Sequence, residues 1–138
     1  MGIPKILVVD DERDMRLFVS TVTETLGFEA ITAQDGAQAL QLAGLNPPAL
    51  VILDVMMPKI DDGIQTYRQF RTDPSLSHIP IIMLSAIAEK TFLHSIKMLS
   101  PRHGPQLPEP EAYMEKPPDA NALSRLISDL LPAVSKNL

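Results

Sequence analysis

The sequence predicts an α/β fold, a doubly wound parallel sheet with helices on both faces. Three observations lead to this prediction: short apolar runs alternate with segments of helical periodicity, several runs are apolar at every position, and glycine, proline or aspartate separates the segments. Runs that are apolar throughout are typical of strands buried on both faces, as in a parallel sheet. Five strands that alternate with five helices make a doubly wound fold.

The predicted strands are the apolar runs between the breaks. The second of them is partly polar, which favours the edge of the sheet over its centre. In chain order the strands are 5–9, 28–33, 49–53, 79–84 and 112–115.

The predicted helices follow from apolar spacing and from capping residues. Residues 12–26 show helical spacing, and Asp35 and Asp119 are candidate N-caps for the second and fifth helices. The third helix follows a predicted turn at Asp61-Asp62-Gly63. The apolar faces contain Ala37, Leu40 and Ala43 in the second helix, Ile64, Tyr67 and Phe70 in the third, Phe92, Leu93, Ile96, Met98 and Leu99 in the fourth, and Leu123, Leu126, Ile127 and Leu130 in the fifth.

The bulk composition narrows the class of protein. The 138 residues suffice for one domain, 1–138, and a formal net charge of −5 disfavours direct binding to nucleic acid. Cysteine is absent, so disulfides and thiolate metal sites are excluded. No apolar stretch approaches the roughly 20 residues of a membrane span, and the first residues lack signal-peptide form. We therefore expect a cytoplasmic domain without membrane contact.

Three aspartates lie at the C-terminal ends of apolar runs. Asp10 and Asp11 close the run 6–9, and Asp54 closes the run 50–53. Ligands of parallel sheets bind just beyond the carboxyl ends of the strands, so neighbouring strands would bring the three carboxylates into one crevice. Like charges this close are costly unless a cation joins them or a proton neutralises one. An all-oxygen cluster suits a hard divalent ion, and we predict Mg²⁺, with Mn²⁺ as the alternative.

Two further polar residues end predicted strands. Ser85 follows the fourth strand and Lys116 follows the fifth. A carboxylate can accept a phosphoryl group, and phosphoryl transfer requires mainly positioning and neutralised charge. The Lys116 ammonium could neutralise charge on the phosphoryl group, and the Ser85 hydroxyl could donate a hydrogen bond to one of its oxygens. Lys116-Pro117 is also a candidate for a cis peptide bond.

Four segments in order resemble the receiver domain of bacterial two-component response regulators, over nearly the whole chain. They are Ile6-Leu7-Val8-Val9-Asp10-Asp11-Glu12, Leu53-Asp54-Val55-Met56-Met57-Pro58, Ile79-Pro80-Ile81-Ile82-Met83-Leu84-Ser85-Ala86 and Lys116-Pro117. The resemblance implies a flavodoxin-like sheet with strand order 2-1-3-4-5. It also implies a signalling switch that catalyses only its own phosphorylation and dephosphorylation and is not a metabolic enzyme.

The resemblance also implies a role for each site residue. Asp54 would be the phosphoacceptor, with Lys116 and Ser85 assisting. Ser85 and Tyr113 would form the switch pair, although Tyr113 could equally be a static, partly buried ring. The metal ligands would be Asp10, Asp11, Asp54 and the backbone carbonyl of Met56. Met56 and Ile87 occupy the positions that tune phosphoryl lifetime, and because both are apolar we predict a long-lived phosphoryl state.

The implied partners are a histidine kinase or phosphotransfer protein as donor and an unknown protein downstream. The face formed by the fourth helix and fifth strand would change on phosphorylation, in a monomer or in a dimer that forms on phosphorylation. The stretch from Ser85 to Lys116 is longer than the family pattern because of a Pro-rich insertion at about 100–111. One extra residue before Gly63 is expected to alter only a turn, and residues 133–138 form a short tail.

Other functions are weighed against this one. The alternative is an interaction module on the same fold that works without phosphorylation, but an unused cluster of carboxylates would destabilise the fold. A metal-dependent phosphatase is disfavoured because Met56 stands where a second aspartate is expected. Flavin binding is disfavoured because the acidic segment 10–12 would repel a phosphate.

Overall fold

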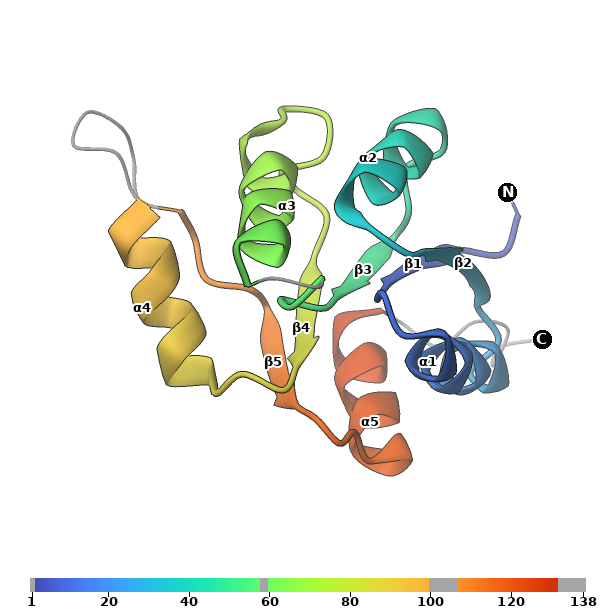
Figure 1. Ribbon diagram of the computed structural model, residues 1–138. Coiled ribbons are helices and arrows are strands. Elements are labelled where there is room, and N and C mark those ends of the chain that lie inside the picture. Colours follow the sequence, from blue (N-terminus) through green and yellow to red (C-terminus); the bar gives the residue numbers. More distant parts are fainter. Residues whose placement is uncertain (1, 58–59, 100–106, 132–138) are drawn as a thin grey trace.

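The architecture is a five-stranded sheet between two layers of helices (Figure 1). This computed structural model describes residues 2–57, 60–99 and 107–131. The strands are parallel and lie in the order β2-β1-β3-β4-β5, which confirms the predicted fold and strand order. The elements, in chain order, are β1 (Lys5–Val9), α1 (Arg13–Thr25), β2 (Glu29–Ala33), α2 (Gly36–Leu45), β3 (Leu50–Leu53), α3 (Ile60–Thr72), β4 (Ile81–Ser85), α4 (Glu89–Leu99), β5 (Ala112–Glu115) and α5 (Ala120–Leu130).

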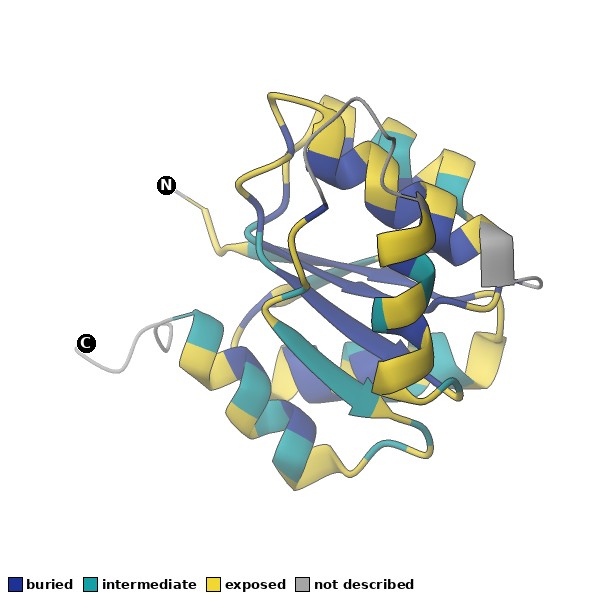
Figure 2. Cartoon of the chain, turned by 90° about the vertical axis from the view of Figure 1, so that its left-hand side faces the viewer, coloured by how far each residue is buried: buried dark blue, intermediate teal, exposed yellow. Residues whose placement is uncertain are grey.

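Two apolar cores lie on the two faces of the sheet. One core joins the sheet to α2, α3 and α4, and the other joins it to α1 and α5. The strands β1, β3 and β4 are buried almost throughout, while the edge strands β2 and β5 consist mainly of half-buried and exposed residues (Figure 2). The predicted edge position of the second strand is confirmed.

Aspartate side chains begin two helices, as predicted. The Asp35 carboxylate accepts the backbone N–H of Gln38 at 2.8 Å, and the Asp119 carboxylate accepts that of Ala122 at 2.8 Å. Each carboxylate satisfies one of the backbone donors left free in a first helical turn. The predicted cis peptide bond Lys116-Pro117 is also present.

The predicted turn at residues 61–63 is wrong, because α3 already begins at Ile60. Gly63 therefore lies in the first turns of the helix. A Cβ atom at this position would overlap the backbone of Val55, which directly follows Asp54. The glycine is needed for close approach between α3 and the segment after β3.

Other boundaries differ by one or two residues, and two residues that were assigned to apolar helix faces are exposed. In α2, Ala37 is exposed while Ala39 is buried. In α4, Met98 is 73% exposed, whereas Leu93 packs against the core as expected. The strand β4 begins at Ile81, although Ile79 before it is buried. Of the Pro-rich insertion the structure describes residues 107–111; residues 100–106 and the tail 133–138 lie outside the described residues. None of the described helices is long and apolar enough to cross a membrane.

Candidate functional site

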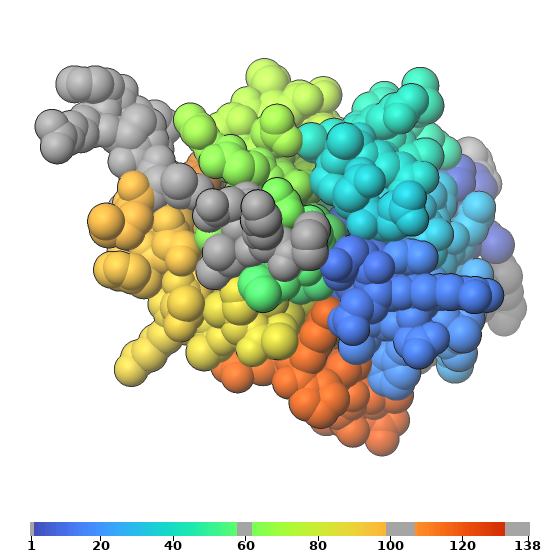
Figure 3. Space-filling model, viewed as in Figure 1, coloured from blue at the N-terminus to red at the C-terminus, as the bar shows by residue number. Residues whose placement is uncertain are grey.

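The pairing of the strands brings the predicted site residues to one edge of the sheet. Val9 pairs with Leu53 in the neighbouring strand, so Asp10 and Asp54, which follow them, lie side by side. Ser85 pairs with Glu115, and Lys116 comes next in the chain. Figure 3 shows the blue, green, yellow and orange segments that follow β1, β3, β4 and β5 meeting on one face.

The Asp54 carboxylate is buried and accepts hydrogen bonds from two donors. It is 3% exposed; its Oδ1 accepts the backbone N–H of Met56 at 3.1 Å, and its Oδ2 accepts Lys116 Nζ at 3.2 Å. Burial, followed by the negative charge of Asp10, raises the pKa of Asp54 to about 6, and the Lys116 ammonium opposes this rise. The carboxylate is thus held in place but is less stable as an anion than an exposed aspartate.

Asp10 and Asp11 complete an acidic cluster with Asp54. Single carboxylate oxygens of the three residues lie within 4.8 Å of one another; Asp10 and Asp54 are buried and Asp11 is exposed. Burial raises the pKa of Asp10 in spite of its hydrogen bonds to Lys116 and to the backbone of Glu12. The first helix begins at a Glu12 N-cap without a side-chain cap bond, so neither aspartate serves as its N-cap.

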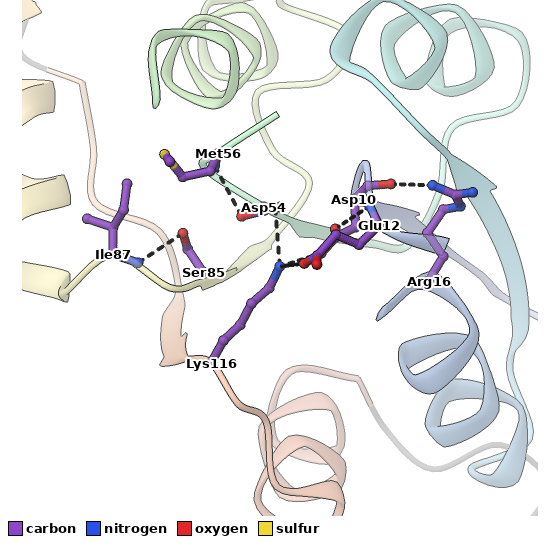
Figure 4. A network of polar contacts seen from close by, with 8 residues as sticks. All are labelled: Asp10, Glu12, Arg16, Asp54, Met56, Ser85, Ile87 and Lys116. Atoms are coloured by element: carbon purple, nitrogen blue, oxygen red, sulfur yellow. Dashed lines mark hydrogen bonds and ion pairs between the residues drawn. The ribbon is translucent and has the colours of Figure 1, made fainter. Parts of the chain in front are cut away.

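Lys116 connects the carboxylates (Figure 4). Its Nζ donates to Asp10 Oδ2 at 2.9 Å, to Asp54 Oδ2 at 3.2 Å and to Glu12 Oε1 at 3.3 Å. Burial alone would lower the pKa of this ammonium, but the two buried aspartates outweigh it and the pKa is raised. Lys116 therefore stays charged at neutral pH and compensates the acidic cluster.

Two site residues were not predicted individually. Glu12 adds a third carboxylate to Lys116, and the Arg16 guanidinium donates to the backbone carbonyl oxygen of Asp10 at 2.7 Å. Glu12 follows two aspartates in the same strand-to-helix turn, which is a signal that sequence reasoning could have used. Arg16 gives no such signal, because its contact depends on how α1 leaves the strand.

The cluster opens to solvent through a cleft of about 280 Å³. Its lining includes Asp54, Lys116 and the half-exposed side chain of Met56, which is 41% exposed. The cleft gives a small ligand access to the carboxylate. Among the described residues, Asp11, Glu12 and Ala86 also line the cleft.

The predicted switch residues lie beside the cluster, at the end of β4. Ser85 is fully buried, and its Oγ accepts the backbone N–H of Ile87 at 3.3 Å. The Tyr113 hydroxyl donates to the carbonyl oxygen of Ile87 at 2.6 Å. Burial is the main reason that the pKa of Tyr113 is raised to about 12, so this hydroxyl keeps its proton. The structure thus brings Ser85, Ile87 and Tyr113 together.

Comparison with known proteins identifies the family. Residues 6–99 match the family model described as the response regulator receiver domain, which is more than half of the chain. The chain belongs to the receiver domains of two-component response regulators. The matched domain is therefore a signalling domain.

Curated relatives of this receiver domain are longer proteins. It is 47% identical over 85 residues to the probable transcriptional regulator ycf27 of Cyanophora paradoxa, which covers 62% of this chain and 34% of that protein. It is 43% identical over 86 residues to the alkaline phosphatase synthesis transcriptional regulatory protein PhoP of Bacillus subtilis, which covers 62% of this chain and 35% of that protein. The matches thus span about a third of these relatives. A third match, to the sensor histidine kinase TmoS of Ectopseudomonas mendocina, is 34% identical over 128 residues and covers 93% of this chain and 12% of that protein.

Solved structures of receiver domains share the fold. The chemotaxis protein CheY4 of Vibrio cholerae superimposes with a TM-score of 0.78 at 25% identity, over 94% of this chain and 100% of that one. The receiver domain of the Francisella response regulator 1452 gives a TM-score of 0.73 at 28% identity, over 92% of this chain and 95% of that one.

Proposed function

We propose that this receiver domain accepts a phosphoryl group on Asp54, in a Mg²⁺-dependent reaction, and thereby changes its partner-binding face. The observation that carries the proposal is the state of Asp54. It is a buried carboxylate, fixed by one backbone donor and one ammonium, and it opens onto a cleft. In the proposed transfer a carboxylate oxygen of Asp54 bonds to phosphorus while the bond between phosphorus and the donor's leaving group breaks.

The acidic cluster fits a hard divalent cation. Asp10, Asp11 and Asp54 offer oxygen atoms only, within 4.8 Å of one another, and the negative charge of Asp10 adds to burial in raising the pKa of Asp54. These three side chains, with the Met56 backbone carbonyl, would hold Mg²⁺. When bound, the ion supplies positive charge opposite the phosphoryl oxygens. The Met56 carbonyl stays a prediction.

Lys116 and Ser85 have separate roles in this proposal. The Lys116 ammonium already contacts Asp54, so it can neutralise a phosphoryl oxygen attached to that residue. The Ser85 hydroxyl can donate to another phosphoryl oxygen, a charge-assisted bond worth about 1.5–3 kcal/mol. If the Ser85 hydroxyl moved toward the phosphoryl group, it would lose the hydrogen bond that it now accepts from the Ile87 N–H. Tyr113, which is hydrogen-bonded to Ile87, would then turn inward and change the surface formed by α4 and β5.

The proposed donor is a histidine kinase or a phosphotransfer protein. The family supports this class of donor, as does the match to a segment of a protein named a sensor histidine kinase. The proposed output is binding of a downstream protein, without direct contact to nucleic acid. Formation of a dimer on phosphorylation stays a prediction.

The test is the intact-protein mass after incubation with acetyl phosphate and Mg²⁺. We expect one added phosphoryl group in wild type and in the control Asp129→Asn, an exposed aspartate of α5, and none in Asp54→Asn or in EDTA. An adduct that persists in Asp54→Asn would contradict the assignment. No adduct in wild type, together with no effect of Mg²⁺ on thermal stability, would favour the interaction module that works without phosphorylation.

A further inference from the structure

Three aromatic rings in contact cross the core between α3, α4 and β5. The ring centroids of Tyr113 and Phe92 are 5.6 Å apart, and those of Phe92 and Tyr67 are 5.4 Å apart in an edge-to-face arrangement. Phe92 and Tyr67 are fully buried. A close-packed interior has no free volume, so a ring that moves at one end of this row must displace its neighbour.

One end of the row lies beside the phosphoacceptor site. The Tyr113 hydroxyl donates to the Ile87 carbonyl at 2.6 Å, and the Ile87 N–H donates to Ser85 at 3.3 Å. Ser85 is the last residue of β4, at the same edge of the sheet as Asp54. A change in the Ser85 hydroxyl therefore reaches Tyr113 both directly, by the hydrogen-bond interaction between the two side chains, and through Ile87.

The other end of the row holds the segment 107–111, which leads into β5. The Tyr67 hydroxyl donates to the carbonyl oxygen of Pro108 at 2.5 Å and accepts Nε of Arg71 at 3.1 Å. Arg71 also donates to Glu111 Oε1 at 2.6 Å and to the Ile79 carbonyl at 3.1 Å. A single buried guanidinium thus fastens α3, the residues before β4 and the segment 107–111 to one another.

Glu111 completes this set of contacts among Tyr67, Arg71, Pro108 and Glu111, which we call the anchor. Its Oε1 also accepts the backbone N–H of Ile81 at 2.7 Å, and its own N–H donates to the Ile81 carbonyl at 3.0 Å. Pro108 and Pro110 have no N–H to donate to the sheet, so side chains supply contacts that the backbone cannot. The Arg71 side chain is only 3% exposed, so loss of Glu111 would leave a buried charge without its counter-ion.

We propose that the row Tyr113–Phe92–Tyr67 couples the phosphoacceptor site to the segment 107–111, which makes this segment an output element of the domain. The proposal rests on the proposed function, in which Tyr113 turns inward when Asp54 carries a phosphoryl group. In the structure Tyr113 is only half-buried against Phe92. Deeper burial of the Tyr113 ring would press Phe92 against Tyr67 and is expected to strengthen the anchor, and by reciprocity a weakened anchor lowers the affinity for a phosphoryl mimic.

The test is amide hydrogen exchange at Glu111 and Ile81, with and without Mg²⁺ and beryllofluoride, which mimics a phosphoryl group on a carboxylate. Bound beryllofluoride is detected separately by its ¹⁹F NMR signals. In wild type we expect exchange at both amides to slow by about fivefold or more, the lower end of typical coupling factors. Bound beryllofluoride without slower exchange would overturn the coupling but leave the proposed function intact. Absence of bound beryllofluoride would overturn both.

Two variants and a control separate coupling from general stability. Phe92→Leu keeps the site apolar but removes the central ring, so it is expected to bind beryllofluoride and lose the slowing at Glu111. Tyr67→Phe keeps the ring and removes the hydroxyl, so Glu111 is expected to exchange faster in both states. Phe28→Leu makes the same change in the core on the opposite face of the sheet and should retain the wild-type response. An unchanged response in Phe92→Leu would contradict the proposal.

Discussion

At the scale of single residues, the ionised Asp54 carboxylate lowers the free energy of unfolding of the protein. Burial and the charge of Asp10 raise its pKa from 3.8 to about 6, although Lys116 acts in the other direction. The folded protein therefore binds a proton here at a pH where the unfolded chain does not, so between about pH 4 and 6 the stability falls as the pH rises. Above pH 6 this destabilisation is complete.

Replacing Asp54 by Asn is expected to remove that destabilisation. In EDTA at pH 8, Asp54→Asn should unfold at higher urea than wild type, with a gain of about 1–3 kcal/mol for a shift of this size. The gain should shrink as the pH falls through 6 and vanish near pH 4. Asp129→Asn serves as the control for a surface charge. A loss of stability at pH 8 in Asp54→Asn would show that the attraction of Lys116 stabilises the Asp54 anion by more than burial destabilises it.

The phosphoryl lifetime also depends on single side chains. Met56 lines the cleft and Ile87 follows the buried Ser85, and neither side chain can orient an attacking water by a hydrogen bond. We expect the phosphorylated protein to last minutes or longer once the donor is removed. Met56→Gln is expected to shorten this by up to about tenfold, the effect of one transition-state hydrogen bond. A wild-type half-life of seconds, followed by intact mass, would contradict this explanation.

The site residues that could be predicted are those at strand ends. Asp10, Asp11 and Asp54 lie at the ends of apolar runs and Lys116 directly follows β5, and the order of strands in a parallel sheet then brings them together. Arg16 could not be found in this way, because its bond to the Asp10 carbonyl depends on the direction of α1. The anchor of Arg71 and Glu111 was missed for the same reason, since it joins residues 40 positions apart.

At the scale of elements, α3 packs closely against the segment after β3. Gly63→Ala would push a methyl group into the backbone of Val55. We expect a loss of about 1–3 kcal/mol, typical of overpacking, and slower phosphorylation because Val55 lies between Asp54 and Met56.

Gly44→Ala in α2 is the matched control. An added Cβ there meets nothing within 4 Å, so this helical glycine should gain about 0.5–1 kcal/mol on substitution. Urea unfolding and the rate of phosphorylation by acetyl phosphate check both variants. Equal behaviour of the two would show that Gly63 has no role in packing.

Element boundaries were harder to predict than the elements themselves. The group Asp61-Asp62-Gly63 is typical of a turn, yet all three residues lie in α3, where Gly63 packs closely against the backbone of Val55. Met98 lies six residues after Phe92, about 240° around the helix, so the helical period itself places it on the exposed side of α4. Tertiary packing therefore explains the first difference, and the helical period explains the second.

At the scale of the whole molecule, the acidic cluster links metal binding to folding. An ion that binds the folded chain alone stabilises it, by about 2.7 kcal/mol at a concentration of 100 Kd. We expect Mg²⁺ to raise the urea midpoint of wild type and of Asp129→Asn, but to have little effect on Asp10→Asn, which lacks one carboxylate of the cluster. An equal rise in Asp10→Asn would place the ion elsewhere.

The central claim is that Asp54 carries the phosphoryl group. The most direct measurement is to phosphorylate the protein with acetyl phosphate and Mg²⁺, reduce the acyl phosphate with borohydride to give homoserine, and locate that residue by peptide sequencing in a mass spectrometer. We predict homoserine at position 54. Homoserine at position 10 or 11 would contradict the claim, because it would make another carboxylate of the cluster the phosphoacceptor.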